Sequence, residues 1–200
     1  MEHFAAVDRK TDETEVSIEL NLNGKGSNKI STGIPFFDHM LKLFAAHGFF
    51  DLSISAKGDI EVDFHHTVED VGLVLGEAFD KAIADGKGIK RFGHSVVPMD
   101  DALTSVTVDL SKRPFLIYNI PVPTNNCKCF GNVSFDTLLA KEFFRAFTAR
   151  GGMNLHINFF YGENGHHILE SIFKAFGRSL DEATSLDSRI EGVLSTKGFL

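Results

Sequence analysis

Residues 65–79 read HHTVEDVGLVLGEAF, and residues 166–180 read HHILESIFKAFGRSL. Both segments begin with two adjacent histidines and carry a glutamate three places after the second histidine. The segments LFAAHGFFDLSI and AFTARGGMNLHI, which come before them, align with each other in the same way. We therefore expect two half-repeats, residues 1–90 and 91–200, which together form one compact domain.

Hydrophobic spacing gives the two halves a similar order of elements. Alternating apolar residues predict strands, as in TEVSIELNL at 14–22. The stretch 51–64 is predicted to be a hairpin of two strands that turns around Gly58. Apolar residues at helical spacing predict helices, among them one over 65–86. The sequence thus predicts an α+β fold, an internally duplicated half-fold with two mixed β-sheets and helices packed between them.

Composition narrows the class of protein. The hydrophobic fraction of 43% and the charged fraction of 24% are ordinary for a globular chain. A net charge of −7 argues against a nucleic-acid partner, and no apolar run is long enough to predict a membrane partner. The first residues lack the features of a signal peptide, and Cys127 and Cys129 are expected to be reduced thiols, with a soft metal as the alternative. These features predict a cytoplasmic protein.

The histidine pairs have the spacing of metal ligands. Residues four apart on a helix share one face, whereas neighbours diverge by about 100°. The first histidine of each pair can therefore bind an ion together with the glutamate, and the second histidine points to a different ion. Imidazole and carboxylate donors suit a divalent ion such as manganese, iron or zinc. The expected metal ligands are His39, His65, His66, Glu69, His156, His166, His167 and Glu170.

Five of the histidines stand alone in the sequence, and two of them, His3 and His94, have no companion motif and are expected to be surface or structural residues. A single histidine such as His39, His156 or His47 is ordinarily a hydrogen-bonded core residue or a cation at a helix end. The doubled pairs favour the ligand interpretation for His39 and His156 and leave His47 open. Because each pair must serve two ions, we expect a homo-oligomer with sites shared between subunits. The alternative, a metal-stapled fold without catalysis, is disfavoured because structural sites prefer cysteine and closed coordination.

Several segments carry a resemblance to a known family. TGIPFFDHML, GIKRFG, SKRPFL, the terminal STKG and the two HHxxE motifs resemble the imidazoleglycerol-phosphate dehydratase family of histidine biosynthesis over about residues 8–198. The resemblance implies dehydration of D-erythro-imidazole-glycerol phosphate, a small phosphate ester, to imidazole-acetol phosphate. It also implies two Mn²⁺ ions per subunit and a 24-subunit shell built from trimers. Ions on both ring nitrogens would favour the imidazolate, which expels the neighbouring hydroxyl before a carboxylate takes the proton.

The same resemblance assigns roles to residues that their patterns alone would leave as surface charges. Glu13 is expected to be the general base and to contact the substrate, with His47 and Asp100 as further catalytic candidates. The expected phosphate ligands are Arg91, Arg113, Lys174, Ser195 and Lys197. Together they would form the basic cluster that an acidic protein needs for a phosphate ester.

Two departures and two rival functions accompany the resemblance. Phe64 stands where the family commonly has an aspartate, which puts a hydrogen bond from that position to His65 or His66 in doubt. The segment PTNNCKCFGN also differs from the family pattern. A metal-storage or metal-assembled shell would not need the basic cluster, and a dinuclear metallohydrolase would need carboxylates that bridge closely spaced ions.

Overall fold

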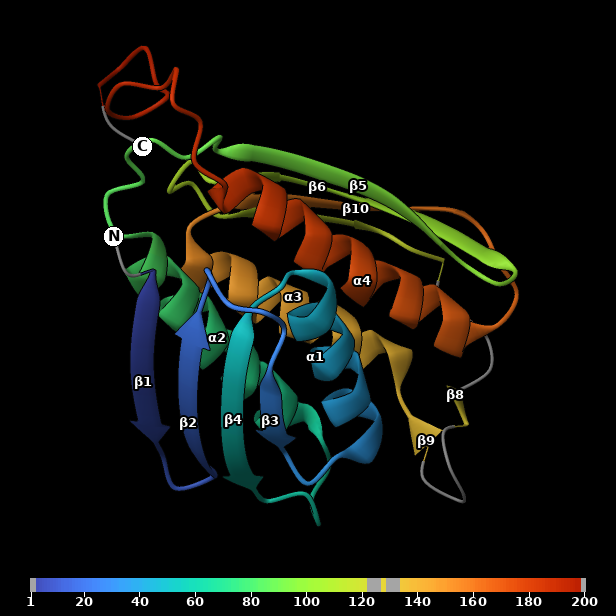
Figure 1. Ribbon diagram of the computed structural model, residues 1–200. Coiled ribbons are helices and arrows are strands. Elements are labelled where there is room, and N and C mark those ends of the chain that lie inside the picture. Colours follow the sequence, from blue (N-terminus) through green and yellow to red (C-terminus); the bar gives the residue numbers. More distant parts are fainter. Residues whose placement is uncertain (1–2, 122–126, 129–133, 199–200) are drawn as a thin grey trace.

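The computed structural model describes residues 3–121, 127–128 and 134–198, and Figure 1 shows how its elements are arranged. In chain order they are β1 (Phe4–Lys10), β2 (Thr14–Asn21), β3 (Asn28–Ser31), α1 (Pro35–His47), β4 (Asp51–Gly58), α2 (His65–Ile83), β5 (Phe92–Met99), β6 (Ala102–Asp109), β7 (Phe115–Asn119), β8 (Cys127–Lys128), β9 (Ser134–Phe135), α3 (Thr137–Gly151), β10 (Asn154–Tyr161) and α4 (Gly165–Thr184). The interpretation of the two cysteines lies outside the described residues, because it requires Cys129.

Two four-stranded sheets of the same topology form the outer layers. Their strand orders are β1-β2-β4-β3 and β5-β6-β10-β7. In each sheet the first three strands pair antiparallel, and the last strand pairs parallel with its neighbour. Helices α1, α2, α3 and α4 lie between the sheets (Figure 1). The predicted duplicated α+β fold with two mixed sheets is therefore confirmed.

The edge strands β1 and β5 were not predicted from the sequence. Strand β2 was predicted, because Val16, Ile18 and Leu20 alternate with polar residues. The structure shows these three side chains almost completely buried. Strand β5 instead contains Gly93 and Pro98, which weaken a strand signal. Proline is tolerated there because β5 lies at the edge of its sheet and needs no amide donor on the outer side.

The predicted hairpin over residues 51–64 is wrong. Only its first half forms a strand, β4, and the following residues form turns that lead to α2. The reason is that β4 already pairs with β2 on one side and β3 on the other. A hairpin partner would have no free edge to occupy, so Asp59 and Val62 close a turn through a backbone hydrogen bond instead.

The helices pair across the two halves. Helix α2 covers the first sheet and packs on α3, whereas α4 covers the second sheet and packs on α1 (Figure 1). Helix α2 ends at Ile83, before the expected Gly86, and Ala84 follows it at a positive φ of 50°. Among the described residues, no helix has the length and apolar character needed to cross a membrane.

Glycines allow the paired helices to approach closely. A Cβ at Gly76 of α2 would lie 2.5 Å from the carbonyl oxygen of Phe147 in α3. A Cβ at Gly177 of α4 would lie 2.4 Å from the carbonyl oxygen of Phe44 in α1. Since the two HHxxE segments align Gly76 with Gly177, both halves use the same contact. These contacts fix how closely the histidine-bearing ends of α2 and α4 approach their partner helices.

We expect Gly177→Ala to destabilise the fold. Its methyl group would overlap backbone atoms of α1 that cannot rotate away, and overpacking a core costs about 1–3 kcal/mol. The higher helix preference of alanine, about 1 kcal/mol, offsets only part of that cost. The urea midpoint measured at fixed protein concentration should fall. The exposed neighbour Arg178→Ala should leave it almost unchanged, and an equal or higher midpoint for Gly177→Ala would contradict the close contact.

Candidate metal and phosphate sites

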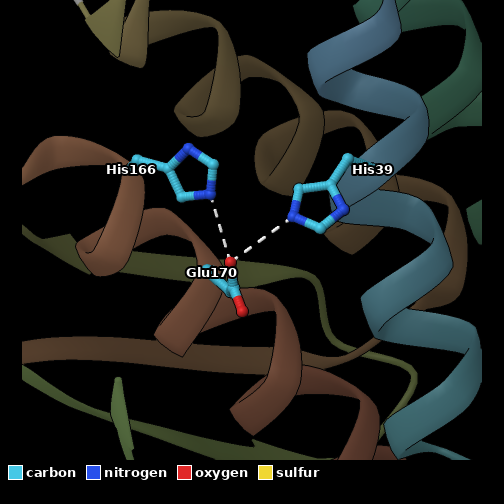
Figure 2. Close-up of side chains that lie close together, drawn as sticks. All are labelled: His39, His166 and Glu170. Atoms are coloured by element: carbon cyan, nitrogen blue, oxygen red, sulfur yellow. Dashed lines mark hydrogen bonds and ion pairs between the residues drawn. The ribbon is translucent and has the colours of Figure 1, made fainter. Parts of the chain in front are cut away.

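Three candidate ligand atoms from helices α1 and α4 lie close together. His166 Nε2 lies 3.1 Å and His39 Nε2 lies 3.4 Å from the same carboxylate oxygen, Oε2 of Glu170. Figure 2 shows both rings directed at that oxygen. Within the part of the chain that the structure describes, this is the only group of three such ligands within 4.8 Å of one another. We call His39, His166 and Glu170 the first cluster.

Local structure holds the first cluster in place. Asn164 caps α4 by accepting a hydrogen bond from the backbone N–H of His166, so the histidine pair lies in the first turn of the helix. Lys174 lies one turn further along, with its Nζ 2.6 Å from Oε1 of Glu170. Burial alone would raise the pKa of Glu170, but the Lys174 ammonium and the histidine N–H groups outweigh it and lower the pKa. The carboxylate is therefore ionised and suited to a cation.

A second group of charged side chains lies between α2 and α3. His65 Nε2 is 3.3 Å from Oε2 of Glu69, as expected for residues four apart on a helix. Arg145 donates from Nη2 to Oε1 of Glu69 and from Nε to Oε2 of Glu142, both at 2.7 Å. We call His65, Glu69 and Glu142 the second cluster.

Glu142 was not among the residues predicted from the sequence. Aligning residues 43–54 with 146–157 and extending the alignment backwards places His39 opposite Glu142. The first cluster of α1 and α4 and the second cluster of α3 and α2 are thus repeat counterparts. The internal repeat contains this signal, but the histidine pattern does not reveal it, because the second half carries glutamate at that position.

The second histidine of each pair turns away from the first. The ring centres of His65 and His66 are 6.2 Å apart with their planes at 90°, and those of His166 and His167 are 6.0 Å apart at 80°. The second histidine of each pair therefore contacts different residues from the first. This agrees with the expected divergence of neighbouring side chains on a helix.

His66 lies beside two carboxylates from loops of the first half. Its Nδ1 is 3.0 Å from Oδ2 of Asp59 and 3.8 Å from Oε2 of Glu13. The hydrogen bond with Asp59, followed by the negative charge of Glu13, raises the pKa of His66. Asp59 thus supplies an orienting carboxylate for this imidazole although Phe64 cannot. Phe64 is the N-cap residue of α2 and its side chain makes no capping hydrogen bond, so Asp63 accepts the backbone N–H of His65 instead.

His167 has a matching environment in the second half. Its Nδ1 is 2.5 Å from Oδ1 of Asp101, and its Nε2 is 3.6 Å from Oδ2 of Asp100. Both aspartates lie in the tight turn between β5 and β6, where Asp100 adopts a positive φ of 45°. Backbone N–H groups from Glu163 and Asn164 and the hydrogen bond with His167 hold the pKa of Asp101 well below its usual range. Glu13 occupies the corresponding turn between β1 and β2.

Two residues predicted from the sequence, His156 and His47, lie outside both clusters of the chain. His156 is exposed on β10, on the face opposite the buried Leu155 and Ile157. His47 is the last residue of α1, where burial, with the positive charge of Lys174 second, lowers its pKa. The structure brings neither into the first or second cluster.

Four of the five expected phosphate ligands line one hollow of about 650 Å³. Its polar lining includes Arg91, Arg113, Ser195, Lys197 and also Arg189, which the sequence did not single out. We call these five residues the basic pocket. The fifth expected ligand, Lys174, does not line it, because its ammonium contacts Glu170 in the first cluster.

The two arginines predicted for the basic pocket are held differently. Arg91 forms a two-pronged pair with Asp109 and donates to the carbonyl oxygen of Leu194. Arg113 has a side chain that is 60% exposed and lies 3.8 Å from the nearer oxygen of Asp109. Arg91 therefore shapes the pocket, whereas Arg113 keeps donors available for an anion.

Comparison with known proteins decides the family. Residues 32–180 match the family model of imidazoleglycerol-phosphate dehydratase. The chain belongs to the imidazoleglycerol-phosphate dehydratase family. The family's enzymes are metal-dependent hydro-lyases of histidine biosynthesis, and the resemblance found in the sequence is confirmed.

Relatives support the assignment over the whole chain. The imidazoleglycerol-phosphate dehydratase of Desulfosudis oleivorans is 58% identical over 99% of both chains. That of Pelobacter propionicus is 54% identical over 100% of both. Two crystal structures are also similar. The Staphylococcus aureus dehydratase has a TM-score of 0.80 at 36% identity, covering 92% of this chain and 99% of its own. The Pyrococcus furiosus dehydratase has a TM-score of 0.77 at 36% identity, covering 97% and 100%.

Proposed function

We propose that the chain converts D-erythro-imidazole-glycerol phosphate to imidazole-acetol phosphate with two Mn²⁺ ions per subunit, as a cytoplasmic step of histidine biosynthesis. The observation that carries the proposal is the first cluster, a ready set of metal ligands in a chain that matches the dehydratases along its whole length.

The ligand atoms fit a divalent ion of intermediate hardness. Each cluster offers imidazole nitrogen and carboxylate oxygen and no thiolate, which suits manganese better than a thiolate-seeking metal. The chemistry that such ions supply is stabilisation of negative charge on the imidazole ring of the substrate, which turns the neighbouring hydroxyl into a leaving group. His66, His167 and His156 complete the proposed ligand sets. A neighbouring subunit would provide the other ligands of the ions that these three histidines bind.

Carboxylates beside the second histidines are placed to move protons. Glu13 is 59% exposed and its carboxylate lies 3.8 Å from His66, so it can reach a substrate bound next to that imidazole. We assign it the abstraction of the carbon-bound proton. Asp100 has the same relation to His167 in the other half and is the second candidate. His47 remains a proposed catalytic residue on the basis of the family resemblance alone.

Phosphate binding is assigned to the basic pocket, with Lys174 as a further ligand. Arg113, Ser195 and Lys197 offer charged and neutral donors around one hollow, and bidentate guanidinium contacts suit a phosphate well. A storage protein has no use for such a pocket.

The divergence of the histidine pairs supports the proposal that subunits share ligands. Because His66 and His167 point away from the clusters of their own chain, we propose that they bind ions of neighbouring chains. The proposed assembly is the 24-subunit shell built from trimers.

Turnover of imidazole-glycerol phosphate with and without added Mn²⁺ tests the proposed function. We expect formation of the keto product only with the divalent ion present. A protein that binds the ion and assembles but gives no product would instead be a metal-assembled shell.

Arg113→Ala is expected to weaken substrate binding. A charge-assisted hydrogen bond contributes about 1.5–3 kcal/mol, so kcat/KM should fall about 10- to 100-fold, mainly through KM. Steady-state kinetics measures this, and metal content should not change. Arg150→Ala, an exposed arginine at the end of α3, is the control. An unchanged KM in Arg113→Ala would place the phosphate elsewhere.

A further inference from the structure

Both ligand glutamates use their two oxygens in the same way. Glu170 directs Oε2 at His166 and gives Oε1 to Lys174 at 2.6 Å. Glu69 directs Oε2 at His65 and gives Oε1 to Arg145 at 2.7 Å. One oxygen of each carboxylate is thus held by a cation of the chain, and the other faces the imidazole.

The two cations do not occupy equivalent positions in the two half-repeats. The residue that aligns with Lys174 in the first half is Leu73, and the residue that aligns with Arg145 is Lys42. Lys174 comes from the same helix as its glutamate, one turn further along, whereas Arg145 reaches across from α3 to α2. Two unrelated side chains therefore make the same contact, which favours a shared role over a by-product of the duplication.

The physical role follows from the freedom of a carboxylate. A glutamate with both oxygens unbound rotates about its last torsion and can chelate an ion through one or two oxygens. A cation on Oε1 fixes that torsion and leaves Oε2 as the single ligand atom. Arg145 does this for Glu69, and its planar guanidinium also donates from Nε to Oε2 of Glu142, which leaves Oε1 of that second carboxylate. It also offsets the repulsion between Glu69 and Glu142.

We propose that Arg145 is a positioning residue that holds Glu69 and Glu142 ready for the metal ion of the second cluster, as Lys174 holds Glu170 in the first. The inference rests on the proposed two-ion function. Because Glu142 stands opposite His39, the two ions would have different ligand sets. The first cluster offers two imidazoles and one carboxylate, and the second offers one imidazole and two carboxylates. The second site therefore has the harder set of donor atoms, with more carboxylate oxygen and less imidazole nitrogen.

Manganese titration of the metal-stripped full-length protein tests this, by isothermal titration calorimetry with bound ions counted by electron paramagnetic resonance. We expect two ions per chain in the wild type. Arg145→Met should weaken binding at one site about 10- to 100-fold and leave the other unchanged. Lys174→Met should weaken Mn²⁺ binding at the other site. His39→Ala removes a proposed ligand of the first cluster and so shows which binding event belongs to that cluster. Arg150→Met, an exposed arginine of the same helix, should change neither.

Each outcome decides the proposal. Arg145→Lys keeps the charge but cannot bridge two carboxylates, so it should restore part of the affinity, and it remains informative if the methionine variant does not fold. Tighter binding in Arg145→Met would show that the arginine competes with the ion, and unchanged binding would show that it does not position the ligands. Either result overturns the inference, as would fewer than two ions in the wild type. Two bound ions without turnover would refute the proposed function alone.

Discussion

Replacement of Glu13 by glutamine is expected to lower turnover by about two to four orders of magnitude. The substitution removes the carboxylate that would accept the carbon-bound proton and keeps the size and polarity of the side chain. Glu13 lies in the turn between β1 and β2 with 59% of its side chain exposed, so no packing is lost. We therefore expect kcat to fall while metal content and assembly stay as in the wild type.

The chain offers a matched control two residues away. Glu15 is an exposed carboxylate on β2 that pairs with Lys10, and Glu15→Gln makes the same change of charge without facing His66. Its turnover should remain near that of the wild type. If Glu13→Gln keeps near-normal activity and Asp100→Asn loses it, the base lies in the turn between β5 and β6.

Chelation of the divalent ions should reduce turnover to background and also break the assembly into smaller units. Under the proposed sharing of ligands both effects have one cause, because an ion bound by histidines of two chains would complete the site and join the subunits. Light scattering before and after chelation measures the mass of the particle, and Mn²⁺ at neutral pH should restore it. His66→Ala should lose more assembly than Arg113→Ala, because the proposed role of the arginine is contact with substrate phosphate alone.

Acid should have the same effect as the chelator. Metal binding requires neutral imidazole, so protons compete with the ion as the pH falls. The hydrogen bond with Asp59 raises the pKa of His66, and this competition therefore begins at a higher pH than for an ordinary histidine. A particle whose mass is indifferent to chelator and to mild acid would show that each site closes within one chain.

The sequence predicted those parts of the sites that depend on contacts close in the chain. The pairings of His65 with Glu69 and of His166 with Glu170 follow from helical spacing alone. The internal repeat likewise predicted two matching sheets. Local patterns gave no warning that β4 would be enclosed by β2 and β3, and the predicted hairpin was wrong for that reason.

Contacts between distant segments were harder to foresee. Asp59 meets His66 because of the turn that replaced the hairpin. Asp101 meets His167 because it lies in the turn after β5, a strand that the pattern did not reveal. Arg145 and Glu69 are brought together by the packing of α3 on α2, which no spacing rule encodes. A carboxylate or guanidinium in isolation gives no sign of its partner.

The glycine contacts fix the spacing of each helix pair, and with it the spacing of the proposed metal ligands. The distance between α1 and α4 at Gly177 also sets the separation of His39 from Glu170, which belong to those two helices. Metal coordination tolerates only a few tenths of an ångström, so a methyl group inserted two turns away would be felt as a loss of affinity. The reverse also holds, since an ion that binds only the correctly spaced helices adds its binding free energy to the stability of the core. The apo protein should therefore be the looser of the two forms, in its interior as well as at its surface.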